Sequence, residues 1–262
     1  MKIAVLGTGH MGGWFIHEFS KNHEVAAYDI NKQKAEQLEY ARPLTGLSEL
    51  RDFRPELLLN AVTLKHTTAV FAEAAPYLRE DCLIADIASI KGDIPDFYSR
   101  HPFPFVSLHP MFGPHFADLD QLKNENAIII TESDRGGKDF FSQFFQTYNL
   151  RVFEHTFAEH DEIMAESLGL PFATSIVFAA ATTGYTVPGT TYARQKGIAR
   201  KLLKEDDSLL CEVLFNPATL RTLEEVSQNY DILRQLIKSR DYAAAGKFFA
   251  VLRKSLEYRE IH

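Results

Sequence analysis

The stretch Gly7-Thr8-Gly9-His10-Met11-Gly12 follows an apolar run, Lys2–Leu6, and opens a segment of helical character. In a G-x-G-x-x-G turn the first glycine allows a tight bend, the second lets the backbone approach a pyrophosphate, and the third lets helix and strand pack closely. The motif alone is weak, because glycine-rich turns also form for purely conformational reasons. Here a strand is expected before it and a helix after it, so the turn predicts a dinucleotide-binding fold.

An acidic residue, Asp29, ends the next apolar run, Glu24–Tyr28, twenty residues beyond Gly9. A carboxylate at this place accepts hydrogen bonds from the adenosine ribose and repels a 2′-phosphate, so the expected cofactor is NAD rather than NADP. Two alternatives stay open. Asp29 could merely cap the helix that begins near Asn31, and the nearby lysines at positions 32 and 34 do not exclude NADP.

The first 154 residues alternate short apolar strands with helical segments, the pattern of a Rossmann-type, doubly wound, mostly parallel α/β sheet with helices on both faces. We expect strands at Lys2–Leu6, Glu24–Tyr28, Leu57–Ala61, Leu83–Ile87, Phe105–Leu108, Ala127–Thr131 and Arg151–Phe153. The helices expected between them are Met11–Ser20, Lys32–Tyr40, Thr67–Leu78 and Gly137–Tyr148.

Beyond this region the pattern changes to long helices without a convincing strand. They are expected at Ala158–Thr182, Thr191–Glu205, Ser208–Phe215, Ala218–Ser239 and Tyr242–Tyr258. We therefore expect a dinucleotide-binding domain over residues 1–154 and an all-helical domain for substrate binding and dimerisation over residues 155–262.

One segment of the helical half, Ser167–Ala193, contains no Asp, Glu, Lys or Arg and is longer than the ~20 residues of a membrane-spanning helix. Pro171, Gly184, Pro188 and eight Ser and Thr residues interrupt it, which argues against a span. A helix that is apolar all round is expected to be buried in a core or in a subunit interface. We therefore expect no membrane segment, and a homodimer formed through the helical half.

Charge and cysteine content exclude several classes of protein. The chain has 28 Lys and Arg against 35 Asp and Glu, a net charge of −7, so no nucleic-acid partner is expected. Cys82 and Cys211 lack C-x-x-C spacing, so neither a disulfide framework nor a metal site is expected. The N-terminal apolar run is shorter than the roughly 7–15 residues of a signal-peptide core. A cytoplasmic location fits these features.

Two further stretches follow expected strands, where doubly wound sheets bind their ligands. Residues 86–91 read D-I-A-S-I-K and residues 109–114 read H-P-M-F-G-P. Together with the glycine turn, they resemble the prephenate dehydrogenase family, tyrosine-pathway enzymes that oxidatively decarboxylate prephenate or arogenate. His160-Asp161 matches the H-D of that family, and a basic helix precedes Glu205, so the resemblance covers residues 3 to about 255.

The resemblance implies that His109 is the catalytic histidine and Ser89 its hydrogen-bonding companion near the nicotinamide. Removing the hydroxyl proton of prephenate while C4 gives a hydride to NAD⁺ creates a ketone, which loses CO₂ and aromatises to 4-hydroxyphenylpyruvate. A neutral imidazole is suited to accept that proton near pH 7. The alternative for His109 is a strand-end histidine whose ring is satisfied by backbone groups. Lys91 could contact the cofactor or the substrate, but a lysine at a helix start is more often solvated, so it receives no role here.

Cofactor contacts are expected from three places. The glycine turn contributes residues 7–12 and the second strand contributes Asp29. Asn60, at the end of a further strand, is expected to contact the ribose or the pyrophosphate. Val62 and Thr63 lie in the loop that follows, which runs along the cofactor in members of the family.

Prephenate carries two carboxylates, which an acidic chain must bind with local cations, and the planar fork of arginine suits them. The helix expected at residues 191–205 offers Arg194, Lys196, Arg200, Lys201 and Lys204. Arg194 and Arg200 lie ~120° apart around a regular helix, so they do not aim at one point. The family resemblance places the arginine that binds the ring carboxylate in this helix. Counting back from Asp206 reaches Lys201, whereas allowing one insertion reaches Arg200. We choose Arg200, then Arg194; the alternative is a solvated basic face.

One departure from the family is Phe172, which stands in Leu170-Pro171-Phe172 where many relatives have L-P-H. Thr174 or Ser175 could replace that histidine, and the choice between prephenate and arogenate and the response to tyrosine stay open.

Two other functions also remain. A different NAD(P)-linked oxidoreductase, such as a β-hydroxyacid dehydrogenase or a pyrroline-carboxylate-type reductase, would not explain HPMFGP. A non-catalytic dinucleotide sensor is favoured by Phe172 alone.

Overall fold

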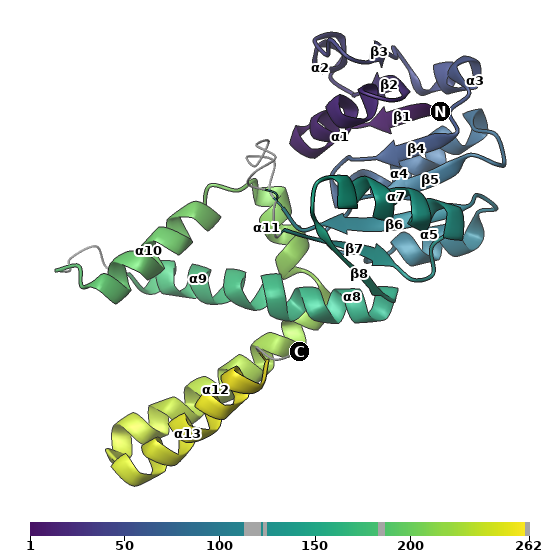
Figure 1. Ribbon diagram of the computed structural model, residues 1–262. Helices are drawn as coiled ribbons and strands as arrows, with labels where there is room; N and C mark the ends of the chain where they lie inside the picture. The colour runs from purple at the N-terminus through teal and green to yellow at the C-terminus, as the bar shows by residue number, and fades with distance from the viewer. Residues whose placement is uncertain (113–121, 123–124, 183–186, 260–262) are drawn as a thin grey trace.

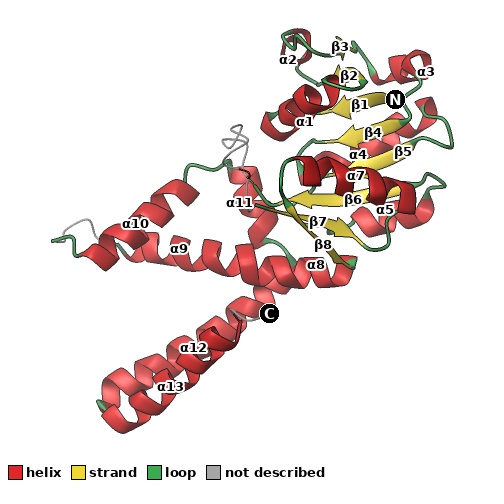
Figure 2. Ribbon diagram, in the orientation of Figure 1, coloured by secondary structure: helices red, strands yellow, loops and turns green. Residues whose placement is uncertain are grey.

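The computed structural model describes residues 1–112, 122, 125–182 and 187–259 of the chain. An eight-stranded sheet with helices on both faces lies beside a group of long helices (Figure 1, Figure 2). This confirms the expected α/β fold with a helical C-terminal half. The strands are β1 (Lys2–Leu6), β2 (Glu24–Tyr28), β3 (Arg42–Pro43), β4 (Leu57–Asn60), β5 (Leu83–Asp86), β6 (Phe105–Pro110), β7 (Asn126–Ile130) and β8 (Arg151–His155).

The strand order is β3-β2-β1-β4-β5-β6-β7-β8, and every neighbouring pair is parallel except β6 and β7. The chain winds one way from β1 to β3 and the other way from β4 onward, so the order reverses beside β1. Leu6 pairs with Asn60, which brings the carboxyl ends of β1 and β4 level with each other. Ligands of open α/β sheets bind at such a reversal, and the glycine turn begins there.

Side chains of each strand alternate between two core layers, as the two-residue period of a strand requires. Ile3 and Val5 pack under α1 (His10–Ser20) and α7 (Arg135–Thr147). Ala4 and Leu6 point to the opposite face, which is covered by α3 (Leu50–Phe53), α4 (Leu64–Ala74) and α5 (Ile94–Arg100). Because both faces are buried, the parallel strands are apolar along most of their length.

The sequence predicts a helix over Lys32–Tyr40, but α2 spans only Lys32–Glu36. The chain has to leave this helix early because Arg42 and Pro43 extend as β3 beside β2 at the edge of the sheet. The short elements β3, α3 and α5 are not among the expected ones. The sequence also predicts the strand at Ala127–Thr131 but not its direction. In the structure this strand is β7, which runs antiparallel to β6.

The helical half begins with α8 (Phe157–Met164), which continues through a π-helical turn (Ala165–Gly169) into α9 (Leu170–Ala181). The helices α10 (Thr190–Leu202), α11 (Asp207–Leu214), α12 (Pro217–Ser239) and α13 (Tyr242–Arg259) follow. Figure 1 shows α12 and α13 side by side as a long hairpin that projects away from the rest of the chain.

The continuous helix Phe157–Ala181 is long and apolar enough, by length and composition alone, to cross a membrane, and one helix of this kind is weak evidence of a span. Its first part packs on the sheet, where Met164 joins a buried cluster with Ile128 and Ile130. Only 28% of its most apolar window is buried within the chain. The expectation of a helix buried in this chain's own core is therefore wrong for α9, and the subunit-interface alternative remains.

Candidate active site

The three motif glycines of the turn after β1 meet different surroundings. Gly7 has a left-handed backbone (φ +88°), and a Cβ there would lie 2.8 Å from the carbonyl oxygen of Ala61. A Cβ on Gly12 would lie 2.0 Å from the carbonyl oxygen of Gly7. Gly9, by contrast, is exposed, and a Cβ there would meet nothing within 4 Å. Gly7 and Gly12 are therefore required by the fold, whereas Gly9 leaves open space at the start of α1.

Asp29 joins this turn to the end of β2. Its Oδ2 accepts hydrogen bonds from the backbone nitrogen and the hydroxyl of Thr8, both at 2.8 Å. Its Oδ1 accepts from the backbone nitrogen of Asn31, the N-cap of α2, at 2.8 Å. Burial raises the pKa of Asp29, but these hydrogen bonds outweigh it and the net pKa is lowered. Three of the roughly four acceptor positions of a carboxylate are thus occupied, which leaves one for a ligand hydroxyl.

The other residues expected to contact the cofactor lie around the same edge of the sheet. Asn60 is 1% exposed, and its amide donates to the carbonyl of Thr67 at 2.9 Å and accepts from the nitrogen of Val62 at 3.3 Å. Asn60 therefore shapes the loop after β4. Thr63 is exposed at the N-cap of α4, and its side chain makes no capping hydrogen bond. In α1 the side chain of His10 is exposed, whereas Met11 packs against the core.

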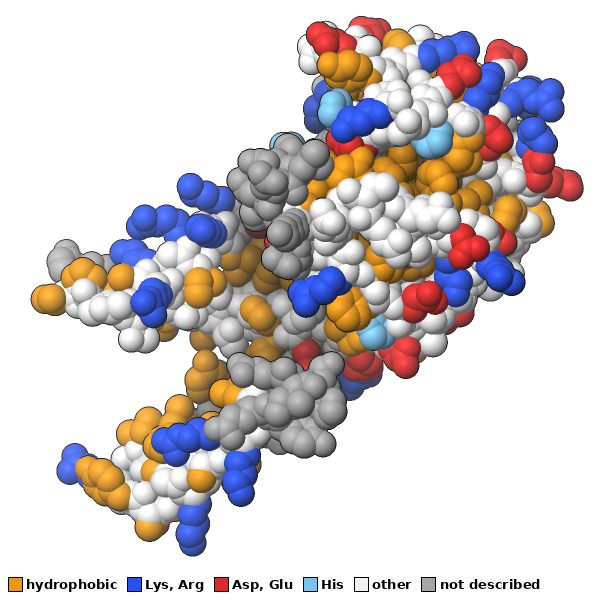
Figure 3. Space-filling model, viewed as in Figure 1, with side chains coloured by type: hydrophobic (Ala, Val, Ile, Leu, Met, Phe, Trp, Pro, Cys, Tyr) orange, Lys and Arg blue, Asp and Glu red, His pale blue; other side chains and the backbone are white. Residues whose placement is uncertain are grey.

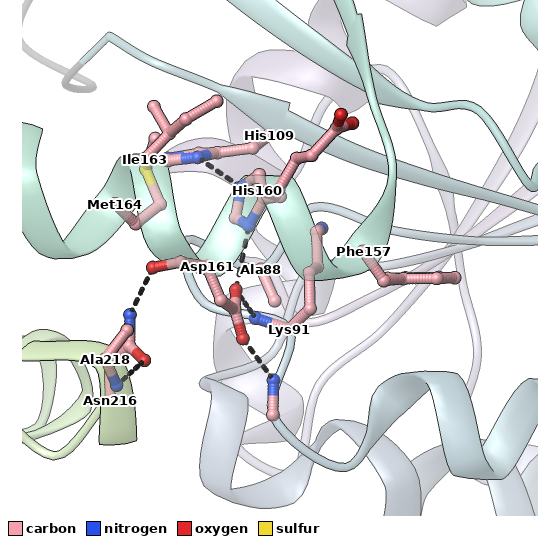
Figure 4. A network of polar contacts seen from close by, with 12 residues as sticks. Ala88, Lys91, His109, Phe157, His160, Asp161, Ile163, Met164, Asn216 and Ala218 are labelled. Carbon is pink, nitrogen blue, oxygen red and sulfur yellow. Dashed lines mark hydrogen bonds and ion pairs between the residues drawn. The ribbon is translucent and has the colours of Figure 1, made fainter.

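His109 lies on β6 and is only 4% exposed. Its Nδ1 is 3.0 Å from Nε2 of His160, and Nδ1 of His160 is 2.9 Å from Oδ1 of Asp161 (Figure 4). His160 stands in the second turn of α8, which begins with a capping box between Thr156 and Glu159. This cap sets where the helix begins and therefore which side of α8 faces β6. Two histidines 51 residues apart are thereby brought together.

Asp161 is held from three sides. Its carboxylate accepts hydrogen bonds from the backbone nitrogens of Lys91, at 2.9 Å, and Gly92, at 3.2 Å. Its backbone carbonyl accepts from the side-chain amide of Asn216, the N-cap of α12, at 2.8 Å. Burial raises the pKa of Asp161, but the hydrogen bonds from His160 and from the two backbone amides outweigh this effect. The net pKa is lowered, so the carboxylate is charged at neutral pH.

Burial is the main reason why the pKa of His109 lies well below 6.5, and the neighbouring His160 and Lys91 lower it further. Burial also lowers the pKa of His160, although Asp161 partly opposes this shift. Both rings are therefore neutral at pH 7. A neutral imidazole at the end of a strand can accept a proton from a bound alcohol.

Lys91 is 0% exposed, so the expectation of a solvated lysine is wrong. Its Nζ donates to Oδ1 of Asp86 at 2.8 Å and to the carbonyl of Leu108 at 2.7 Å, and Tyr98 donates to Oδ2 of Asp86 at 2.8 Å. Burial lowers the pKa of Lys91, and the charge of Asp86 opposes this shift. Because Leu108 precedes His109, this buried ion pair secures the backbone immediately before the histidine.

Ser89 lies half-buried in the loop between Asp86 and Lys91, after β5. Within the described part of the chain no hydrogen bond joins Ser89 to His109; His160 contacts the Nδ1 atom instead. A contact between Ser89 and the nicotinamide stays a prediction. Of the HPMFGP stretch, Gly113 and Pro114 lie outside the described residues.

The proposed carboxylate-binding residues Arg200 and Arg194 are both exposed on α10, which packs along α9. Lys201 is exposed on the same helix, and Lys196 lies over the ring of Tyr192 at 5.8 Å. Figure 3 shows Lys and Arg side chains gathered along this helix. The helix thus presents a basic surface, as its sequence indicates.

Sequence reasoning gave no separate role to His160, Asp161, Lys91 or Asp86. One local signal was present. Thr156 and Glu159 have the spacing of a capping box, which places the H-D pair near the start of a helix. The burial of Lys91 had no such signal, because its second acceptor, the carbonyl of Leu108, lies on β6 and comes within reach only once β5 and β6 lie side by side.

Residues 13–149 match the family model described as prephenate dehydrogenase, nucleotide-binding domain. This chain belongs to the prephenate dehydrogenase family. A probable arogenate/prephenate dehydrogenase of Methanocaldococcus jannaschii is 24% identical over 255 residues, which cover 90% of this chain and 56% of that protein. This chain therefore spans little more than half the length of that curated relative.

Solved structures of this family share the fold. The prephenate dehydrogenase of Aquifex aeolicus, crystallised with hydroxyphenyl propionate and NAD⁺, superposes with a TM-score of 0.81 at 18% identity, covering 98% of both chains. Synechocystis arogenate dehydrogenase superposes with a TM-score of 0.78 at 18% identity, covering 99% of both chains. At this identity the likeness shows the fold alone.

Proposed function

We propose that this protein is an NAD-dependent dehydrogenase that converts prephenate to 4-hydroxyphenylpyruvate by oxidative decarboxylation. The observation that carries the proposal is a neutral, nearly buried His109 at the end of β6, in a chain of the prephenate dehydrogenase family. A histidine held only for packing would not need a second histidine and a charged carboxylate lined up behind it.

The turn after β1 fits a dinucleotide. Open space at Gly9 and the N-terminus of α1 suit a pyrophosphate, and the remaining acceptor position of Asp29 suits a ribose hydroxyl. Thr8, His10 and Met11 would lie along the pyrophosphate side, with Val62 and Thr63 along the loop after β4. When bound, NAD⁺ supplies the acceptor for the hydride.

His109 would accept the hydroxyl proton of the substrate as C4 is oxidised, and the resulting ketone would lose CO₂. Ser89 would orient the nicotinamide or the substrate hydroxyl. Arg200, with Arg194 as second choice, would bind a carboxylate, since bidentate arginine contacts suit this group. The relatives named above leave both prephenate and arogenate as substrates, and the two differ at the side chain.

We further propose that the protein is a cytoplasmic homodimer that pairs through its helical half. Large apolar side chains are exposed on α9, α12 and α13, among them Val177 (54%), Ile237 (67%) and Leu256 (69%). Apolar patches of this kind mark interaction surfaces. Both cysteines are free thiols, which suits a reducing compartment.

The test is NADH formation with prephenate and with arogenate, run side by side, in wild type and in His109→Asn. We expect turnover with prephenate and a loss of about 10²–10⁴-fold in kcat for the variant, the range for removal of a general base. NAD⁺ affinity should be nearly unchanged in that variant. NAD⁺ binding without turnover of either substrate would favour the sensor, and full activity of His109→Asn would contradict the role of this residue.

Cofactor choice has its own test. Asp29→Ala should narrow the preference for NAD⁺ over NADP⁺, because the carboxylate both binds the ribose and repels a 2′-phosphate. Tighter binding of NADP⁺ than of NAD⁺ by the wild type would contradict the assignment. Since Asp29 also holds the turn through Thr8, thermal unfolding of the variant should be compared with wild type.

A further inference from the structure

The hydrogen-bond chain His109–His160–Asp161 admits only one arrangement of protons at neutral pH. Asp161 is charged and can only accept, so Nδ1 of His160 must carry the proton between them. His160 is neutral, so its Nε2 carries no proton and must accept. Nδ1 of His109 therefore has to be the donor across the 3.0 Å contact.

We propose that His160 and Asp161 are positioning residues that hold His109 in the tautomer protonated at Nδ1, so that Nε2 is the atom that receives the substrate proton. The inference rests on the proposed function for its catalytic meaning, but the tautomer itself does not. Which ring nitrogen is basic is set by the hydrogen bond that the other nitrogen makes.

The surrounding contacts make this arrangement rigid. His160 is 0% exposed, so water does not compete for its ring. The carboxylate of Asp161 already accepts from the amides of Lys91 and Gly92, so it cannot rotate away without leaving two backbone donors unpaired. Asn216 holds the backbone of Asp161 from α12. Three separate segments of the chain thus act on the imidazole of His109: α8, the loop at Lys91 and Gly92, and the N-cap of α12.

The same chain matters once the proton has been transferred. His109 then carries a positive charge, and its Nδ1–H still donates to Nε2 of His160, whose own Nδ1–H points to the charged Asp161. The charged side chains that act on this pair are Lys91, which disfavours the cation, and Asp161 and Asp86, which favour it. Loss of His160 removes the acceptor that faces the new charge.

The decisive measurement is ¹⁵N NMR of the histidine rings of the full chain at neutral pH, with His109→Asn used to assign the signals. For wild type we expect a protonated Nδ1 and an unprotonated Nε2 in His109. A wild-type ring protonated at Nε2 would overturn the proposal, whatever the enzyme does with prephenate. This readout does not depend on turnover, so failure of the proposed function and failure of the tautomer assignment are distinguishable.

Two variants of one residue separate positioning from packing. His160→Phe keeps a ring but removes the acceptor, and we expect His109 to shift to the other tautomer or to a mixture. His160→Gln supplies an amide oxygen that can accept from Nδ1–H, so we expect it to keep the wild-type tautomer. If both variants keep the wild-type ¹⁵N pattern, His160 does not set the tautomer and the proposal fails.

Kinetics with the preferred substrate give the matching result. His160→Phe should lower kcat by about 10²–10⁴-fold, the range for loss of a general base, with little change in KM or in NAD⁺ affinity. His160→Gln should recover most of that loss. Equal losses in both variants, with the tautomer unchanged in His160→Gln, would assign His160 to packing and contradict a positioning role.

Discussion

Alanine at Gly12 and at Gly9 should have opposite effects, although the two glycines belong to one turn. At Gly12 the new Cβ would lie 2.0 Å from the carbonyl oxygen of Gly7 and 3.3 Å from Cβ of Ala61. Real Cβ atoms essentially never approach another atom within 3.0 Å, so α1 or the turn has to move by about 1 Å. Overpacking costs typically 1–3 kcal/mol, and the rigid backbone carbonyl places Gly12→Ala at about 3 kcal/mol or more.

At Gly9 the backbone angles, φ −63° and ψ −170°, suit any residue, and a Cβ would meet nothing within 4 Å. Replacing glycine by alanine at a compatible position stabilises a protein by about 0.4–1 kcal/mol, because the unfolded chain loses freedom. Gly9→Ala should therefore be as stable as wild type or slightly more stable. The same methyl group would occupy the space proposed for the pyrophosphate, and we expect NAD⁺ affinity to fall about tenfold or more, which is 1.4 kcal/mol.

Urea unfolding followed by the fluorescence of Trp14 measures the first effect, since the chain has one tryptophan and it lies in α1. Titration of each folded variant with NAD⁺ measures the second. The reasoning is refuted if Gly12→Ala lies within about 1 kcal/mol of wild type, or if Gly9→Ala binds NAD⁺ as wild type does.

Three further predictions concern charge and assembly. The free energy of unfolding should fall as the pH drops below 6.5, because His109 and His160 stay neutral when folded and take up protons when unfolded; each contributes up to about 1.4 kcal/mol per pH unit. Urea unfolding of wild type and His109→Asn checks this, and equal slopes against pH would contradict it. Arg200→Ala should raise KM for the substrate with little change in kcat, since a carboxylate contact exists in ground and transition states alike; a raised KM only in Arg194→Ala would show that the assumed insertion before Asp206 is misplaced. Sedimentation at micromolar concentration should give a dimer, weakened by Ile237→Asp, whereas a monodisperse monomer would argue against the helical interface.

The glycine turn and the strands around it were predictable because their signals are local. The first two strands match the expected ranges to the residue, since a strand buried on both faces is a continuous apolar run with sharp ends. The direction of β7 has no such signal. Its apolar residues, Ala127–Ile130, would read the same in either direction, so they do not indicate that β7 runs antiparallel to β6.

His109 was predictable as a candidate from its motif, but its partners were not. A fully buried lysine is rare in proteins, and the residues around Lys91 in the sequence do not indicate that it is buried. Lys91 is tolerated there only because Asp86 and the carbonyl of Leu108 accept hydrogen bonds from its ammonium group. The contact between His109 and His160 depends on how α8 lies against β6, which neither segment reveals alone.

These contacts also bear on the two-domain division expected from the sequence, whose boundary near residue 154 falls in the last residues of β8, just before α8. His109 and Lys91 lie on the sheet side of that boundary, whereas His160 and Asp161 lie on the helical side. A chain ended there would keep the glycine turn and Asp29, and with them the proposed cofactor contacts. It would leave His109 without the acceptor for its Nδ1 proton, and the amides of Lys91 and Gly92 without the carboxylate that binds them. The sheet half alone therefore carries the proposed dinucleotide contacts. The proposed proton transfer requires both halves, because the residues that set the tautomer of His109, His160 and Asp161, come from α8.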